Sequence, residues 1–135
     1  NGLADDFSAK TGFERELLDL MSHLDANNVQ NVVFVVMDVH FAMTIKYEFD
    51  ANGDGDNLLT HEFVSGPNNA VFVPPPTEVD PSMSPTILYS VGDLFNFGYY
   101  RIAEQDGQMV FIGDIRDEDG NVLEGSEVVV TPAAN

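Results

Sequence analysis

Residues 31–40 read NVVFVVMDVH, an unbroken apolar run that ends in an acid and a histidine. A β-branched run of this kind lacks the alternation of a half-exposed strand. It therefore predicts an inner strand over residues 31–37, buried on both faces. Asp38 and His40 follow at the carboxyl end of that strand, where open α/β sheets place their ligands. The stretch predicts both a sheet and a site beside it.

The flanking sequence predicts one helix before this strand and hairpins after it. Apolar residues recur at helical spacing from Leu17 to Leu24, and Thr11 with Glu14 matches a capping box, so we expect a helix over about residues 12–26. Alternating or apolar runs predict later strands over residues 43–49, 59–64, 86–91, 99–104, 109–115 and 127–131. Asp106-Gly107 is a tight-turn signal between two of them. The predicted fold class is α+β, with one amphipathic helix and then mostly hairpin strands.

Composition limits the classes of partner. The 135 residues include 23 acidic and only 5 basic side chains, for a net charge of −18, yet 44% are hydrophobic, which excludes a disordered acidic tail. Such a charge argues against nucleic acid and anionic membranes as partners. No apolar run approaches the ~20 residues of a membrane span. There is no Cys, so disulfides and thiolate metal sites are excluded. Hard cations such as Ca²⁺ or Mg²⁺, or a high-salt medium, would both suit the excess carboxylate.

Asp38 and His40 are the first candidate site. On extended backbone, a D-x-H spacing sends both side chains to the same side, about 7 Å apart at the Cα atoms. A carboxylate and an imidazole so placed could share one metal ion or bridge a pair about 3.5–4 Å apart. The alternative interpretation is that the strand reaches the surface here and that both residues contact water.

An acidic loop is the second candidate. The residues that match positions 1, 3, 5 and 7 of a calcium loop are Asp50, Asn52, Asp54 and Asp56, and Gly55 stands at position six. Position twelve is His61, with Glu62 one place too late, and no helix pair flanks the loop, which argues against an EF-hand. An irregular Ca²⁺ site in a hairpin loop and a plain solvated turn both remain open.

Weaker signals lie elsewhere in the chain. Residues 65–69 offer amides and a hydroxyl that could line a pocket or form a turn, and residues 114–119 are typical of a solvated hairpin end. The chain has no Walker loop, G-x-G-x-x-G or G-x-S-x-G motif. Nucleotide binding and serine hydrolysis therefore have no support from motifs.

Several segments resemble the C-terminal region of PhoD-type alkaline phosphatases. The matching segments, in order, are Glu14–Leu18, Asn31–Met37, Asp38–Ala42, Glu62–Pro67, Phe97–Arg101, Ile115–Asp117 and Asp119-Gly120. They span nearly the whole chain and correspond to the family's "ER-x-LL", "GDVH-[FY]-A" and "EFV-x-[GS]-P" motifs and its closing strands. Met37 differs, because it stands where the family has Gly.

The resemblance implies a secreted metallophosphoesterase that acts on phosphate monoesters and diesters with calcium and iron. It implies that Asp38 and His40 are metal-site residues, and that His40 could also stabilise charge on a phosphate oxygen. It further implies that residues 1–135 are one C-terminal segment of a larger domain, the last part of a layered α/β/β/α sandwich. The family's first metal motifs would then lie upstream, in cis or on a separate chain, and this chain alone would be inactive.

Three hypotheses follow. The leading one is a fragment of a metal-dependent phosphoester hydrolase, secreted or periplasmic, from marine or high-salt surroundings. The second is an acidic Ca²⁺-binding structural module without catalysis, based on residues 50–56 and the net charge. The third is an adaptation to salt, in which the acids bind nothing specific.

Overall fold

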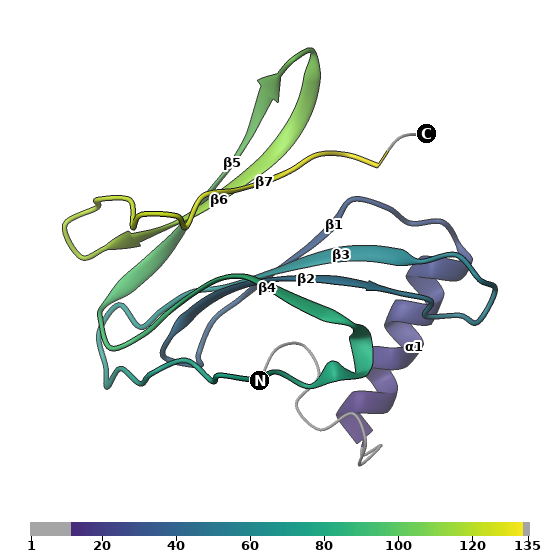
Figure 1. Ribbon diagram of the computed structural model, residues 1–135, viewed down its shortest axis with the longest axis horizontal. Coiled ribbons are helices and arrows are strands. Elements are labelled where there is room, and N and C mark those ends of the chain that lie inside the picture. The colour runs from purple at the N-terminus through teal and green to yellow at the C-terminus, as the bar shows by residue number, and fades with distance from the viewer. Residues whose placement is uncertain (1–11, 134–135) are drawn as a thin grey trace.

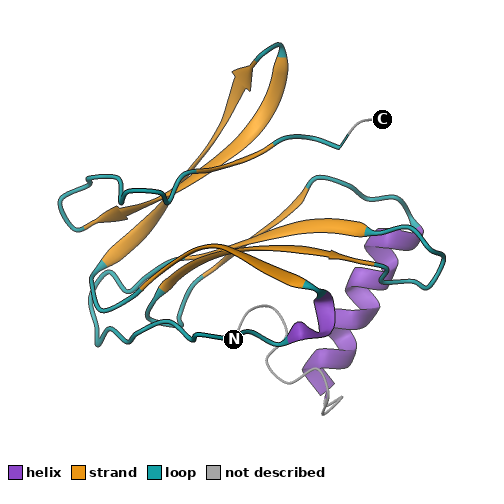
Figure 2. Cartoon of the chain, viewed as in Figure 1, coloured by secondary structure: helices purple, strands orange, loops and turns teal. Residues whose placement is uncertain are grey.

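The computed structural model describes residues 12–133 and shows an α+β fold in which strands predominate (Figures 1 and 2). The elements are α1 (Gly12–Ala26), β1 (Val32–Val36), β2 (Ala42–Phe49), β3 (Leu58–Val64), the short 3₁₀-helix η2 (Pro81–Met83), β4 (Pro85–Val91), β5 (Asn96–Gln105), β6 (Gln108–Asp117) and β7 (Val128–Val130). The predicted helix and strands are confirmed, with their ends moved by up to three residues. The predicted cap of Thr11 and Glu14 lies outside the described residues and side chains.

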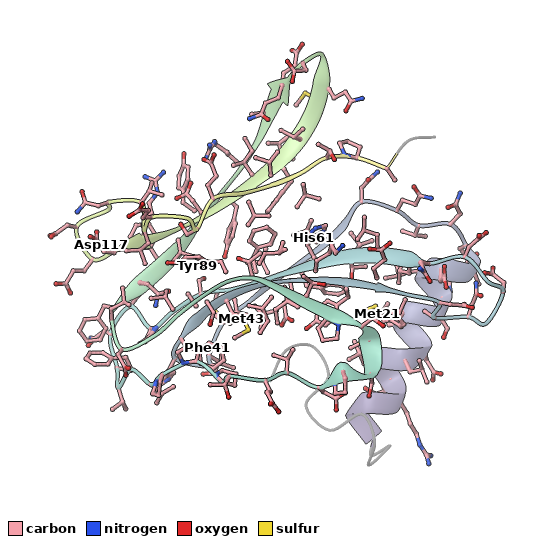
Figure 3. All side chains as sticks on the ribbon, in the orientation of Figure 1. Met21, Phe41, Met43, His61, Tyr89 and Asp117 are labelled. Atoms are coloured by element: carbon pink, nitrogen blue, oxygen red, sulfur yellow. The ribbon has the colours of Figure 1, made fainter. Side chains whose placement is uncertain are left out.

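One sheet has four strands in the order β1-β3-β2-β4, with α1 packed against one face. The core of this layer alternates along β2, where Met43, Ile45 and Tyr47 face the helix. Met21 of α1 is fully buried among them, and Figure 3 shows Met21 and Met43 on the helix side of the sheet with His61 on the opposite side. The period-two pattern of β2 therefore places its apolar face on the helix.

The prediction of an inner strand at residues 31–37 is wrong for the described part of the chain. β1 pairs in parallel with β3 alone and forms one edge of the sheet. Val35 is 50% exposed and Met37, just past the strand, is 68% exposed. An apolar run of this kind predicts an inner strand with both faces covered, but within residues 12–133 β1 has a neighbouring strand on only one side, and the face that carries Val35 is left half exposed.

The second sheet has three strands in the order β5-β6-β7. Asp106 and Gly107, both at positive φ, turn β5 into β6 as predicted. This sheet lies on the face of the first sheet opposite α1, and the β5–β6 turn points away from it (Figure 1). The layers formed by residues 12–133 are thus one helix, one four-stranded sheet and one three-stranded sheet.

Phe63 of β3 joins the two sheets. Its ring packs edge-on against Tyr100 of β5, with ring centroids 5.7 Å apart, and against Phe111 of β6 at 5.3 Å. The ring also lies over Gly113, where an added Cβ would stand 2.5 Å from Phe63 Cε1. Close packing between the sheets at this point therefore requires a residue without a side chain.

We expect Gly113→Ala to destabilise the fold by about 1–3 kcal/mol, because the new methyl group must push the Phe63 ring away. Chemical denaturation of the variant measures the loss. Phe63→Leu provides the matched control, since a smaller side chain leaves room for the methyl group. The double variant should lose less stability than the sum of the two single variants, and strict additivity would contradict the contact.

His61 is buried on the face of β3 that points away from α1. Burial lowers the pKa of this imidazole below its ordinary value of 6.5, and the positive charge of Lys46 on the adjacent strand adds to the effect. The folded protein therefore holds His61 neutral at a pH where the unfolded chain takes up a proton.

This difference predicts that stability falls as the pH drops below about 6.5, until the lower pKa of the folded state is passed. His61→Gln should remove that part of the slope when unfolding free energy is measured from pH 8 to pH 5. His23→Gln on the exposed surface of α1 is the control and should leave the slope in place. An unchanged slope in His61→Gln would show that other groups account for it.

Candidate functional site

Asp38 and His40 lie in the short bend between β1 and β2. Both residues have positive φ, 85° and 63° respectively, in a segment that is not extended. The extended backbone assumed for the D-x-H spacing is therefore wrong. Positive φ is uncommon for residues other than glycine, and such strained positions cluster at functional sites. Here the strained bend reverses the chain within five residues, Met37 to Phe41.

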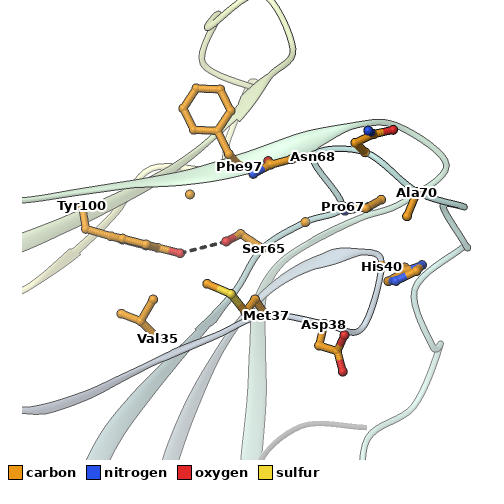
Figure 4. Close-up of a pocket in the computed structure, with 13 residues that line it drawn as sticks. Val35, Met37, Asp38, His40, Ser65, Pro67, Asn68, Ala70, Phe97 and Tyr100 are labelled. Carbon is orange, nitrogen blue, oxygen red and sulfur yellow. Dashed lines mark hydrogen bonds between the residues drawn. The ribbon is translucent and has the colours of Figure 1, made fainter.

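The bend nevertheless brings Asp38 and His40 to one pocket of about 470 Å³ (Figure 4). Its second wall is the segment after β3, residues 65–70, and its third wall comes from β5, with Gly98 and Tyr100. The volume is within the range of small-molecule sites. Both sheets thus contribute to the pocket, which lies where β1 and β3 end side by side.

Asn96, at the start of β5, holds the second wall. Its side chain is 1% exposed and acts like a peptide group toward Gly66: Nδ2 donates to the Gly66 carbonyl at 2.7 Å, and Oδ1 accepts from the Gly66 amide at 2.8 Å. The Asn96 amide also donates to the Pro67 carbonyl at 3.0 Å. On the other side, the Ser65 amide donates to the Val36 carbonyl of β1 at 3.1 Å. Residues 65–67 are therefore bonded to both sheets.

Tyr100 closes the pocket from the second sheet. Its hydroxyl donates to Ser65 Oγ at 3.3 Å, drawn as the dashed line in Figure 4. Burial raises the pKa of the Tyr100 hydroxyl, and the negative charge of Asp114 adds to this, although the hydrogen bond with Ser65 opposes it. The phenol therefore stays protonated and remains a hydrogen-bond donor at neutral pH.

The donor chemistry of the pocket suits a metal ion, although the number of charged donors is small. Asp38 offers a carboxylate and His40 an imidazole, and the amide side chains of Asn68 and Asn69 belong to the same lining. Within residues 12–133, no three His, Asp or Glu side chains gather closely enough to hold a metal ion. Among the residues that the structure describes, Asp38 and His40 are thus the two side chains of this lining that carry a carboxylate or an imidazole.

The acidic loop lies at the far end of the first sheet. It follows β2, whose eight residues span roughly 25 Å from the bend at His40. The structure therefore separates Asp50, Asn52, Asp54 and Asp56 from Asp38 and His40. Strands β2 and β3 flank the loop, so the helix pair of an EF-hand is absent here.

The loop is organised around its carboxylates. Asp50 accepts hydrogen bonds from the amides of Gly53, at 2.6 Å, and Gly55, at 3.0 Å. Hydrogen bonds from the Asp56 amide and the Asn52 side chain lower the pKa of Asp54. Asp25 of α1 also reaches the loop, where Oδ2 accepts from the Ala51 amide at 2.9 Å. Asp25 could not be predicted from local sequence patterns, because the contact joins residues far apart in the chain.

Comparisons with known proteins leave the chain without an assigned relative: no family model, curated protein or solved structure matches it. Within residues 12–133, no helix has the length and apolar character needed to cross a bilayer. The geometry described above therefore carries the functional conclusions.

We expect Asn96→Ala to lower the free energy of unfolding by about 1–3 kcal/mol, because it leaves buried polar groups of Gly66 without partners. The sharper effect is local: the Gly66 amide should lose its protection against hydrogen exchange, measured residue by residue. Asn121→Ala, in an exposed turn, is the matched control and should leave the Gly66 amide protected. Unchanged protection in Asn96→Ala would contradict the role of Asn96 in holding this wall.

Proposed function

We propose that this chain is part of a metal-dependent phosphoester hydrolase of the PhoD type, to which it contributes Asp38 and His40. The observation that supports this most is the convergence of three resembling segments on one pocket. Asp38–Ala42, Glu62–Pro67 and Phe97–Arg101 lie far apart in sequence, and each supplies lining residues. If the resembling segments were merely scattered over the surface, there would be no reason for them to line one pocket together.

The residues of the pocket can divide the chemistry among them. A bound metal ion would polarise the phosphoryl group and lower the pKa of a water nucleophile. Asp38 would supply an anionic oxygen ligand, and His40 would supply a nitrogen ligand or donate to a phosphate oxygen. The Asn68 and Asn69 side chains could donate to the substrate's remaining oxygens. Calcium and iron are the metals that the resemblance suggests.

The proposal includes a second polypeptide segment. Asp38 and His40 are too few for a complete site, so further ligands would come from an upstream part of the enzyme, in cis or as a separate chain. The observed layers of helix and two sheets would then form one portion of an α/β/β/α sandwich. A secreted or periplasmic enzyme in salty surroundings would fit the net charge of −18.

Manganese binding tests the site, because Mn²⁺ is paramagnetic and accepts carboxylate and imidazole ligands. The chain has three His residues, so each imidazole signal can be followed by NMR. We expect His40 to broaden at lower Mn²⁺ concentration than exposed His23, and Asp38→Asn to abolish that preference. Equal broadening of His23 and His40 would show only accumulation of cations around an acidic protein, and would overturn the proposal.

Hydrolysis provides the second test. The purified 135-residue chain should show no turnover of phosphate monoesters or diesters with Ca²⁺ and Fe³⁺ present, since its ligand set is incomplete. Robust turnover that is lost in His40→Ala would show that this chain needs no further segment, which would contradict the proposed division.

An acidic Ca²⁺-binding module without catalysis is the second candidate, supported by the ordered carboxylates of the loop and by Asp25 beside them. Calorimetry with Ca²⁺ separates the candidates. Heat of binding that is lost in Asp54→Ala but kept in His40→Ala favours the module. The reverse pattern favours the hydrolase site, and a response to NaCl equal to that to CaCl₂ favours a general adaptation to salt.

A further inference from the structure

The pocket has two chemically different ends. Asp38 and His40 form a polar end (Figure 4). Val35, Met37 and the ring of Tyr100 form an apolar end, without a charged side chain in its lining. The proposed reaction uses only the polar end, so the apolar end has no role in it.

The Tyr100 wall is held rigidly. Its ring stacks on Phe111 with centroids 5.9 Å apart and planes 22° apart, and Phe63 packs edge-on against it. Two glycines make room for it: an added Cβ on Gly98 would collide with the Tyr100 hydroxyl oxygen, and one on Gly113 would lie 3.1 Å from Tyr100 Cδ1. The hydroxyl is fixed by Ser65 at 3.3 Å. A preformed aromatic wall of this kind presents a flat apolar face at little entropic cost.

The facing wall belongs to the first sheet. Val35 is in register with Phe63 of β3, so the two side chains share the face that points to the second sheet. Met37 follows two residues later, and Figure 4 shows it between Val35 and Ser65. Val35 and Met37 are 50% and 68% exposed, so both can contact a ligand without displacing other side chains. A methionine thioether adapts its shape readily to an aromatic partner.

We propose that this apolar end is a subsite for a planar, uncharged ring carried by the phosphoester, held between Tyr100 on one side and Val35 with Met37 on the other. The proposal rests on the proposed function only for the placement of the phosphate near Asp38 and His40. An uncharged ring is specified because the apolar end has no charged partner to replace the hydration of an ionic group.

Methionine methyl NMR tests the subsite directly. Three of the five Met residues, Met21, Met43 and Met83, are fully buried and report on the fold, while Met109 is 56% exposed at the far hairpin and serves as the control. Phenol and phenyl phosphate should each move the Met37 methyl signal upfield, through the ring current, and leave Met109 in place. Inorganic phosphate should leave Met37 unmoved.

Two variants at one position isolate the aromatic wall. Tyr100→Phe keeps the ring and should retain the Met37 response, whereas Tyr100→Leu should require about tenfold more phenyl phosphate, equivalent to roughly 1.4 kcal/mol. If Tyr100→Leu disturbs the three buried methionines, Val35→Ser replaces it, with Leu59→Ser as an exposed control on the neighbouring strand.

The outcomes separate this subsite from the proposed function. A Met37 response to phenol without selective broadening of His40 by Mn²⁺ would support the subsite and overturn the phosphoester site. Equal shifts of Met37 and Met109 would mean non-specific contact and would overturn the subsite. No shift of Met37 would also overturn it.

Discussion

The packing of Phe63 onto Gly113 is the contact on which the pocket depends. Phe63 lies two residues before Ser65, so the contact that joins the sheets also sets where the chain leaves β3. Tyr100 packs on the same ring from β5 and then donates to Ser65. One aromatic cluster therefore fixes the distance between the sheets and the positions of two pocket walls. Since protein interiors are close-packed, a single added methyl group at this point would displace residues that line the pocket.

Hydrogen bonds and ion pairs then set the orientation of chain segments that apolar packing alone does not determine. Asn96 bonds to both sides of the Gly66 peptide, which fixes the direction of the turn as well as its position. On the face of β6 opposite Gly113, Asp114 is 1% exposed and accepts from Arg101 at 3.0 Å and from Arg116 at 2.7 Å. In a chain with only 5 basic residues, two of them neutralise this one carboxylate. A buried carboxylate without such partners would be strongly destabilising.

Local sequence patterns were sufficient to predict the helix and strands, but not which strands and side chains surround them. The helix, the alternating strands and the turn at Asp106 depend on neighbours within a few residues, and all were predictable. The edge position of β1 was not, because an apolar run specifies a hydrophobic strand without specifying how many strands flank it. The solvated turn predicted for residues 114–119 was wrong at Asp114 for the same reason, since its two Arg partners are recognisable only once β5 and β6 pair. Asn96 carried no signal at all, because its partner lies 30 residues away.

Within residues 12–133, one edge of β1 has no partner strand, and this edge ends beside Asp38 and His40. Asp38 lies two residues after the end of β1. A strand that paired with the unpaired edge of β1 would therefore have one of its ends beside the polar end of the pocket. Natural edge strands usually carry charges or proline that prevent such pairing, and Val32–Val36 has neither. Pairing would occur in the plane of the sheet, whereas Val35 projects from its face toward Tyr100. An added strand would therefore close the side of the pocket without filling its apolar end, and under the proposed function it would be placed to bring further ligands to Asp38 and His40.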